Sequence, residues 1–332
     1  MNSWIKNAAE YFSGLRSPRE ELQGVRVLAF HGVLEKKTDM TLERNLHLLS
    51  NFKDQIRILR QYQVISLSEL HELINQRKPI NSKMVVITFD DGYANNLLAG
   101  EILQTEKLPW SLFLTAGEVG ENRCIWPVEL SLLLLHGEAS KVEWNEKKWS
   151  LRKRSEREIA FKEIRYSLKA LPAVERQEAL SAIRMQFPED ETNRLLKKFP
   201  SLAMLSWKQV DQLASSGVEM GSHGWTHELH HPAQSRQARI YELKESRAEI
   251  ARRLSRPCRF FAYPNGDFMD NSAQEVREEG YDFGFTTRSG TVTTDSNQWL
   301  LPRLEISDST RLRPVLKAES IKKKTPMLHH PS

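Results

Sequence analysis

Four short apolar runs, each followed by a polar residue or a turn, constrain the fold of this 332-residue chain more than any other feature. Short apolar runs bounded by turn residues are typical of buried strands in a largely parallel sheet. We therefore expect four such strands, each ending beside residues that can do chemistry. The runs are 25–30 before His31, 84–89 before Asp90, 218–222 before His223, and 259–263 before Pro264.

Helical patterns separate these expected strands. Apolar residues recur at three- and four-residue steps over residues 42–62, which predicts a helix there. Ser66 and Glu69 have the spacing of a capping box and predict a second helix. A third is predicted over residues 233–254. The alternation indicates an α/β architecture, and one α/β barrel with insertions fits the chain length.

The segment of residues 126–205 departs from this alternation. Its sequence is mostly helical in pattern and heavily charged. We expect a helical insertion that covers one face of the barrel as a lid or as a wall on the substrate side. A solvated structural elaboration with no part in the chemistry is an equally good interpretation.

The composition excludes several classes of protein. Mean hydropathy is −0.53, and no run approaches the ~18 apolar residues that a spanning helix needs. A net charge of +5, with no basic stripe among aromatics, makes nucleic acid a poor candidate partner. Two cysteines cannot build a disulfide framework, and no signal-peptide pattern is present. The cytoplasm is the expected location, with weak membrane-surface association through a short amphipathic helix in residues 4–15 as an alternative to packing of that helix on the domain.

Asp90 and Asp91, followed by Gly92, form the first candidate catalytic element. At the carboxyl end of a strand, the turn that follows lets both carboxylates approach one pocket. One acid could then hold a cation while the other acts as a base. Taken alone, the same three residues are also typical of a surface turn.

His223 and His227 form the second element. If the residues between them make a helical turn, both imidazoles lie on one face, as a zinc site requires. One added carboxylate would give three protein ligands and leave a position for water or substrate, which is typical of catalytic zinc. Two exposed loop histidines are the alternative. The neighbouring His230 and His231 are expected at the surface.

Residues 259–266 form the third element, with aromatic side chains and a turn stiffened by Pro264. Backbone N–H groups in such a turn can donate to a developing oxyanion. A buried strand followed by an ordinary turn is the alternative.

Taken together and in this order, the motifs at residues 88–93, 222–227 and 261–266 resemble the polysaccharide deacetylase family, also known as the NodB homology domain or carbohydrate esterase family 4. The resemblance covers residues 25–306. It implies a deformed (β/α) barrel whose site lies at the carboxyl ends of the strands. We expect a catalytic domain over residues 25–308, an N-terminal extension over 1–24 and a C-terminal tail over 309–332, disordered from Lys322.

The resemblance also implies roles for individual residues. Asp90 resembles the general base, and Asp91 resembles a metal ligand together with His223 and His227. The metal in such enzymes is typically Zn²⁺, and other divalent ions can substitute. The backbone N–H of Asn265, next to Gly266, falls where the family's oxyanion donor lies.

Two positions need separate arguments. The C-terminal motif that supplies the general acid in many members is missing, but in a subset a histidine after the first strand resembles the acid, and His31 fits that pattern. The alternative for His31 is a structural hydrogen bond.

Many members have an arginine at the position of Ala262 to orient the catalytic aspartate. Arg303 could supply that charge instead.

The expected reaction is hydrolysis of the acetamide of an N-acetylated glycan, in carbohydrate metabolism, with bacterial surface-polysaccharide synthesis as one setting for it. Trp126, Trp225 and Tyr263 are candidates for stacking on the sugar, although any of them could be core residues. The alternatives are a non-catalytic carbohydrate-binding protein on the same fold and an amide hydrolase acting on a small non-sugar substrate. Nothing in the sequence defines an oligomeric state.

Overall fold

The computed structural model of the chain describes residues 24–120 and 122–317. The amphipathic segment of residues 4–15 and the tail from Lys322 lie outside this range. Within it, the core is an eight-stranded sheet in which every strand pair is parallel. Its strands are β1 (Arg26–Phe30), β4 (Gln63–Val64), β5 (Met84–Phe89), β6 (Ser111–Leu114), β9 (Glu219–Ser222), β10 (Phe260–Ala262), β11 (Phe283–Phe285) and β12 (Leu304–Glu305).

The sheet curves into a deformed (β/α) barrel, as predicted. Its order is β11-β10-β9-β6-β5-β1-β12, with β4 paired to the start of β5. An isolated bridge from Phe285 to Leu301 brings β11 next to the segment that leads into β12, so the two ends of the sheet approach each other. The four predicted strands correspond to β1, β5, β9 and β10. Every residue of β1 and β5 is buried, as expected of parallel strands covered on both faces.

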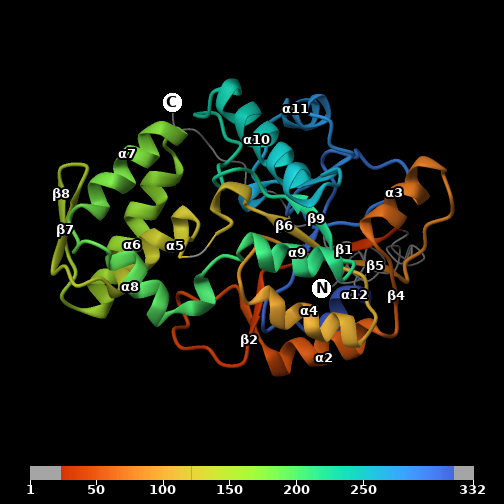
Figure 1. Cartoon of the computed structure of the whole chain (residues 1–332), viewed down its shortest axis with the longest axis horizontal. Coiled ribbons are helices and arrows are strands. Elements are labelled where there is room, and N and C mark those ends of the chain that lie inside the picture. The colour runs from red at the N-terminus through yellow and green to blue at the C-terminus, as the bar shows by residue number, and fades with distance from the viewer. Residues whose placement is uncertain (1–23, 121, 318–332) are drawn as a thin grey trace, which may run out of the picture.

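Helices pack around the sheet (Figure 1). The predicted N-cap is confirmed, since the Ser66 hydroxyl accepts from the Glu69 N–H at 3.0 Å. The helix predicted over residues 233–254 forms as α10 (Arg236–Leu254), and within it Glu249 pairs with Arg253 at 2.8 Å. The helices are α2 (Leu49–Leu59), α3 (Leu67–Asn75), α4 (Asn96–Thr105), α9 (Trp207–Ser215), α10 (Arg236–Leu254), α11 (Ser272–Glu278) and α12 (Leu312–Lys317), with 3₁₀ turns η1 (Ala116–Glu118), η2 (Pro200–Leu202) and η3 (Pro264–Gly266).

The helix predicted over residues 42–62 is correct only in its second half. Helix α2 begins at Leu49, and the residues before it form β3 (Leu46–Leu48), which pairs in parallel with β2 (Gly32–Leu34). Side chains compete with the helix here. The Asp39 carboxylate accepts from two backbone N–H groups at residues 41 and 42, and Glu43 accepts from the N–H of Asp39. Such local bonds favour a turn over a helix.

The segment of residues 126–205 is mostly helical, as predicted, and it also contains a β-hairpin that the sequence pattern did not indicate. In Figure 1 these elements gather on one side of the barrel. They enclose an apolar cluster of their own, which includes Leu130, Ile164 and Ile183. The elements are α5 (Trp126–His136), β7 (Lys141–Trp144), β8 (Lys147–Ser150), α6 (Arg154–Lys169), α7 (Ala173–Arg184) and α8 (Glu191–Lys198).

Two contacts fix this insertion to the barrel beside His227. The buried Arg176 of α7 pairs with the buried Glu228, and the Trp126 indole donates to the His227 carbonyl at 3.3 Å. Among the helices of residues 24–120 and 122–317, none is long and apolar enough to cross a membrane.

Candidate metal and catalytic site

The polar residues that follow the predicted strands line one cavity. His31 follows β1, Asp90 and Asp91 follow β5, and His223 follows β9. Asn265, in the turn after β10, lines the same cavity. The carboxyl ends of parallel strands share one edge of the sheet, and this shared edge brings together residues far apart in the sequence.

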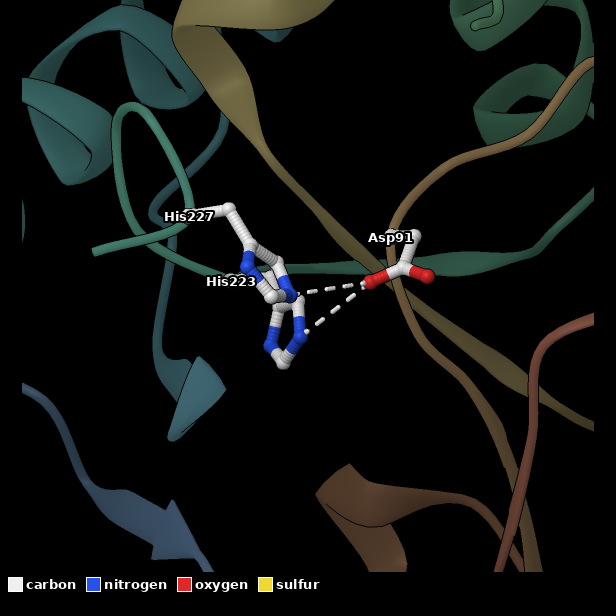
Figure 2. A group of neighbouring side chains, drawn as sticks. All are labelled: Asp91, His223 and His227. Carbon is white, nitrogen blue, oxygen red and sulfur yellow. Dashed lines mark ion pairs between the residues drawn. The ribbon is translucent and has the colours of Figure 1, made fainter. Parts of the chain in front are cut away.

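Asp91, His223 and His227 form a compact group of potential metal ligands. All three are buried, and one ligand atom from each lies within 4.8 Å of the others. The Asp91 Oδ1 is 3.4 Å from each histidine Nε2 (Figure 2). Two ligands bound at about 2.0–2.1 Å around a tetrahedral ion lie about 3.3 Å apart, so these separations fit such an ion. A carboxylate with two imidazoles is a donor set that suits zinc and leaves a coordination position open.

Neighbouring groups hold these side chains in place. The His223 Nδ1 lies 2.8 Å from the Ala262 carbonyl oxygen, which directs Nε2 toward Asp91. The buried Nδ1 of His227 has no hydrogen-bond partner among the described residues. Burial would raise the pKa of Asp91, but the hydrogen bonds with the two histidines hold it well below its usual range.

The segment between the two histidines is not the helical turn that we predicted. It is an irregular loop in which His227 has a φ of 65°. The physical reason is Glu242 of α10, whose Oε2 accepts from the N–H groups of Trp225 and Thr226 at 2.7 and 2.8 Å. These bonds give the loop backbone partners outside a helix, and the imidazoles still converge.

The turn after β5 brings both carboxylates into the same cavity. Asp91 has a φ of 73° and Gly92 a φ of 91°, so two consecutive residues adopt left-handed backbone conformations. The Asp91 carbonyl accepts from the Thr115 N–H, which fixes this turn against the end of β6. An ordinary extended continuation of β5 would have directed the two side chains to opposite faces.

Arg303 forms a buried bidentate ion pair with Asp90. Its two terminal nitrogens lie 2.7 and 2.6 Å from the two carboxylate oxygens. Arg303 is 0% exposed and Asp90 is 4% exposed. Burial would raise the pKa of Asp90, but the charge of Arg303, with His223 contributing, lowers it. Arg303 thus provides the positive charge beside Asp90 that we expected to be missing because residue 262 is an alanine.

His31 lies between β1 and β2, and Asn265 lies in the turn η3 after β10. His31 is half-buried, and its carbonyl accepts from the Asn96 side-chain amide at 2.8 Å. Asn265 has a φ of 58°, which turns the backbone back toward the cavity after Pro264. Its side-chain oxygen accepts from the Lys169 ammonium at 2.8 Å, so the insertion contacts this turn directly.

Two of the three aromatic candidates do not reach the cavity. Tyr263 is fully buried, and its hydroxyl donates to the Trp299 carbonyl at 3.0 Å. The Trp225 side chain packs against Gly117 and is not part of the cavity wall. Trp126 does line the cavity. Tyr263 is absent from the cavity wall because side chains alternate along the strand, and the side chain of residue 263 points into the core.

The expectation that His230 lies at the surface is wrong. His230 is 1% exposed and packs against the rings of Phe261 and Tyr263. Burial lowers its pKa to about 3, so it is a neutral core residue. His231 is half-buried.

Sequence reasoning missed three basic residues of the cavity wall. Arg44 lies in the loop before β3, and Arg165 and Lys169 lie in the last two turns of α6. The four-residue spacing of the last two places them on one side of their helix. That spacing was visible in the sequence, but a charged helix face is ordinarily solvated, so it gave no specific signal.

Asp39 fastens the loop that carries Arg44 to the insertion. It pairs with Arg154 at 3.0 Å and with His136 at 2.8 Å. Burial would raise the pKa of Asp39, but the Leu42 N–H and these two side chains lower it to about 2.

The folded-state pKa of Asp39 is below its unfolded value of about 3.9, so its contribution to stability is present above pH 4 and is lost as the pH falls toward 2. We expect Asp39→Asn to lower the free energy of unfolding by about 1–2 kcal/mol at pH 7. Chemical denaturation from pH 7 to pH 3 should show the gap to wild type narrowing below pH 4. Asp54→Asn, which changes an exposed pair, is the control. A gap independent of pH would contradict this assignment.

Fold and site together define a (β/α)-barrel protein with a candidate metal centre at the carboxyl ends of its strands. A family model described as polysaccharide deacetylase matches residues 77–284, which is more than half of the chain. The chain therefore belongs to the polysaccharide deacetylase family.

Named relatives match a shorter stretch. The chain is 26% identical over 122 residues to the poly-β-1,6-N-acetyl-D-glucosamine N-deacetylase of Staphylococcus aureus, covering 34% of this chain and 41% of that protein. It is 27% identical over 120 residues to the protein of the same name from Staphylococcus epidermidis, covering 33% and 41%. The chain thus spans less than half the length of these curated relatives.

Solved structures support the fold over most of the chain. IcaB from Ammonifex degensii superposes with a TM-score of 0.58 at 19% identity, covering 90% of this chain and 99% of that one. The Streptococcus pyogenes deacetylase PplD gives a TM-score of 0.57 at 16% identity, covering 87% and 94%. At these identities the likeness concerns the fold.

Proposed function

We propose that the chain is a metal-dependent hydrolase that removes N-acetyl groups from an N-acetylated sugar or polysaccharide precursor, with residues 25–308 as its catalytic domain. The observation that carries this proposal is one cavity with two acids in different environments. Asp91 faces two histidines, and Asp90 is held by Arg303. Two carboxylates with separate partners are suited to separate tasks.

Asp91, His223 and His227 would hold the ion, most simply Zn²⁺. When bound, such an ion polarises the amide carbonyl and lowers the pKa of water toward ~7. Asp90 accepts the proton of the attacking water, and its pairing with Arg303 keeps it ionised and oriented. The Asn265 N–H donates to the developing oxyanion. His31 gives a proton to the leaving amine nitrogen, so that acetate and a free amine result.

Our expectation for His31→Ala is a turnover lowered by about 10²–10⁴-fold, the usual range for loss of a general acid. Metal content should stay at the wild-type level, because His31 is outside the ligand group. Acetate release and metal content measured on the same sample check both points. His71→Ala is the control, since His71 lies outside the cavity. Unchanged turnover in His31→Ala would leave His31 a structural residue.

The names of the relatives favour a glycan deacetylase over two alternatives, which are a non-catalytic carbohydrate-binding protein and an amide hydrolase acting on a small non-sugar substrate. Acetate release from N-acetylglucosamine oligomers, compared with release from small non-sugar acetamides, tests the choice. Turnover of the oligomers supports the glycan deacetylase, and for such an enzyme we propose a role in surface-polysaccharide synthesis. Turnover of the small amides alone would favour the non-sugar hydrolase. Glycan binding without any acetate release would favour the non-catalytic carbohydrate-binding protein.

A further inference from the structure

Three cationic side chains converge on one wall of the cavity. Arg44 reaches it from the loop before β3, and Arg165 and Lys169 reach it from α6 of the insertion. The Arg165 guanidinium lies 5.8 Å from the ring centre of Phe161, which lines the same wall. Arg165 and Lys169 are half-buried, and Arg44 is exposed.

Within residues 24–120 and 122–317, no carboxylate lies within ion-pair distance of these three cations. Among the described residues, the Lys169 ammonium donates to the neutral side-chain oxygen of Asn265 at 2.8 Å. Four arginines of the insertion, in contrast, have acidic partners. Arg154, Arg176, Arg184 and Arg194 each pair with an acid.

Among the acids near the cavity, two have other partners, one is exposed, and one is half-buried. Asp90 is paired with Arg303, and Asp91 faces the two histidines. Glu305 lies exposed on the lining, and Asp267 is the acid whose charge acts on Lys169.

Repulsion among the three cations is not cancelled by these acids. Burial lowers the pKa of Arg165, and the charge of Arg44 lowers it further. Burial also lowers the pKa of Lys169, and the charges of Arg165 and Arg44 add to this effect despite Asp267. Gathering partly desolvated like charges opposes folding, and a bound anion would relieve the cost.

We propose that Arg44, Arg165 and Lys169 bind an anionic group of the substrate, a phosphate ester or a carboxylate on the sugar that carries the acetamide. This inference rests on the proposed deacetylase function. Guanidinium groups bind both kinds of anion through paired hydrogen bonds, and an ammonium acts as a point charge beside them. The bond from Lys169 to Asn265 places the anion site next to the proposed oxyanion donor. The anion and the acetamide therefore lie on the same or adjacent sugar units.

The test compares three sugars that carry the same acetamide. They are methyl N-acetylglucosaminide, N-acetylglucosamine 1-phosphate and N-acetylglucosaminuronic acid. We expect kcat/KM for acetate release to be at least about tenfold higher for one of the anionic sugars than for the neutral one. Preference for the phosphate or for the carboxylate identifies which anion the site accepts. Arg165→Gln should reduce this advantage about tenfold, Arg165→Lys should retain part of it, and Lys162→Gln on the exposed face of α6 should retain all of it.

A second readout does not require turnover. Calorimetric titration of Asp90→Asn with the same sugars should give tighter binding of the anionic sugar, and this difference should shrink as salt is added. Equal kcat/KM for neutral and anionic sugars would overturn the inference and leave the deacetylase proposal standing. Acetate release from none of the three sugars would count against the deacetylase proposal. The titration would then be the test of whether the three cations bind an anionic sugar more tightly than the neutral one. Equal or absent binding of the anionic sugar overturns the inference.

Discussion

Asp90→Asn should release acetate about 10²–10⁴-fold more slowly than wild type, the range expected when a general base is lost. The amide of asparagine has nearly the shape of the carboxylate, and its oxygen can still accept a hydrogen bond from Arg303. It cannot accept a proton from water. Because Asp90 is not in the group of potential metal ligands, the variant should keep its metal.

Single-turnover acetate release on folded, metal-replete protein is the measurement for Asp90→Asn. Asp282→Asn is a matched control, since it makes the same chemical change in an ion pair with Arg259 outside the cavity. Its turnover should be close to wild type. Wild-type turnover in Asp90→Asn would remove Asp90 as the base.

Arg303→Met should destabilise the fold by about 3–5 kcal/mol, the cost of removing one partner from a buried ion pair. The substitution leaves the carboxylate of Asp90 buried without its charge partner, because Arg303 supplies both close bonds to it. Turnover should fall as well, since the carboxylate is then no longer oriented. Urea denaturation followed by circular dichroism measures the first effect, and acetate release measures the second.

A double-mutant cycle separates the interaction energy between Arg303 and Asp90 from the interactions that each makes with other residues. Arg303→Met with Asp90→Asn should be less destabilised than the sum of the two single variants, by about 0.5–3 kcal/mol. Arg288→Met is the matched control, because Arg288 is exposed and lies near the same end of the sheet. Simple additivity of the two changes would show that Arg303 and Asp90 act independently.

Much of the fold could be predicted because its strands carry two independent signals. The runs that became β1 and β5 are apolar except for Arg26 and Thr88, and a polar residue or glycine turn ends each one. Local hydrogen bonding was harder to foresee. The carboxylates of Asp39 and Glu43 accept hydrogen bonds from backbone N–H groups where the start of one helix was expected. The Glu242 carboxylate does the same in the loop between His223 and His227.

The candidate site divides in the same way. The acids and histidines stand in short motifs, so their convergence followed from strand order. Arg303 was named as a candidate partner of Asp90 only because a charge was missing at residue 262, and its actual position depends on packing between residue 303 and β5, which are more than two hundred residues apart. Arg44 and Arg165 lie in segments whose contact with the cavity depends on how the insertion docks, and no local pattern encodes that docking.

Metal content per chain, measured for zinc-replete wild type, Asp91→Ala and Asp90→Asn, shows whether Asp91, His223 and His227 hold an ion. We expect about one tightly held ion in wild type and in Asp90→Asn. In Asp91→Ala we expect the affinity for the ion to be weakened by more than about 100-fold, beyond the usual effect of changing an outer partner of a ligand. Folded wild type without metal, or Asp91→Ala that keeps its ion, would contradict the account.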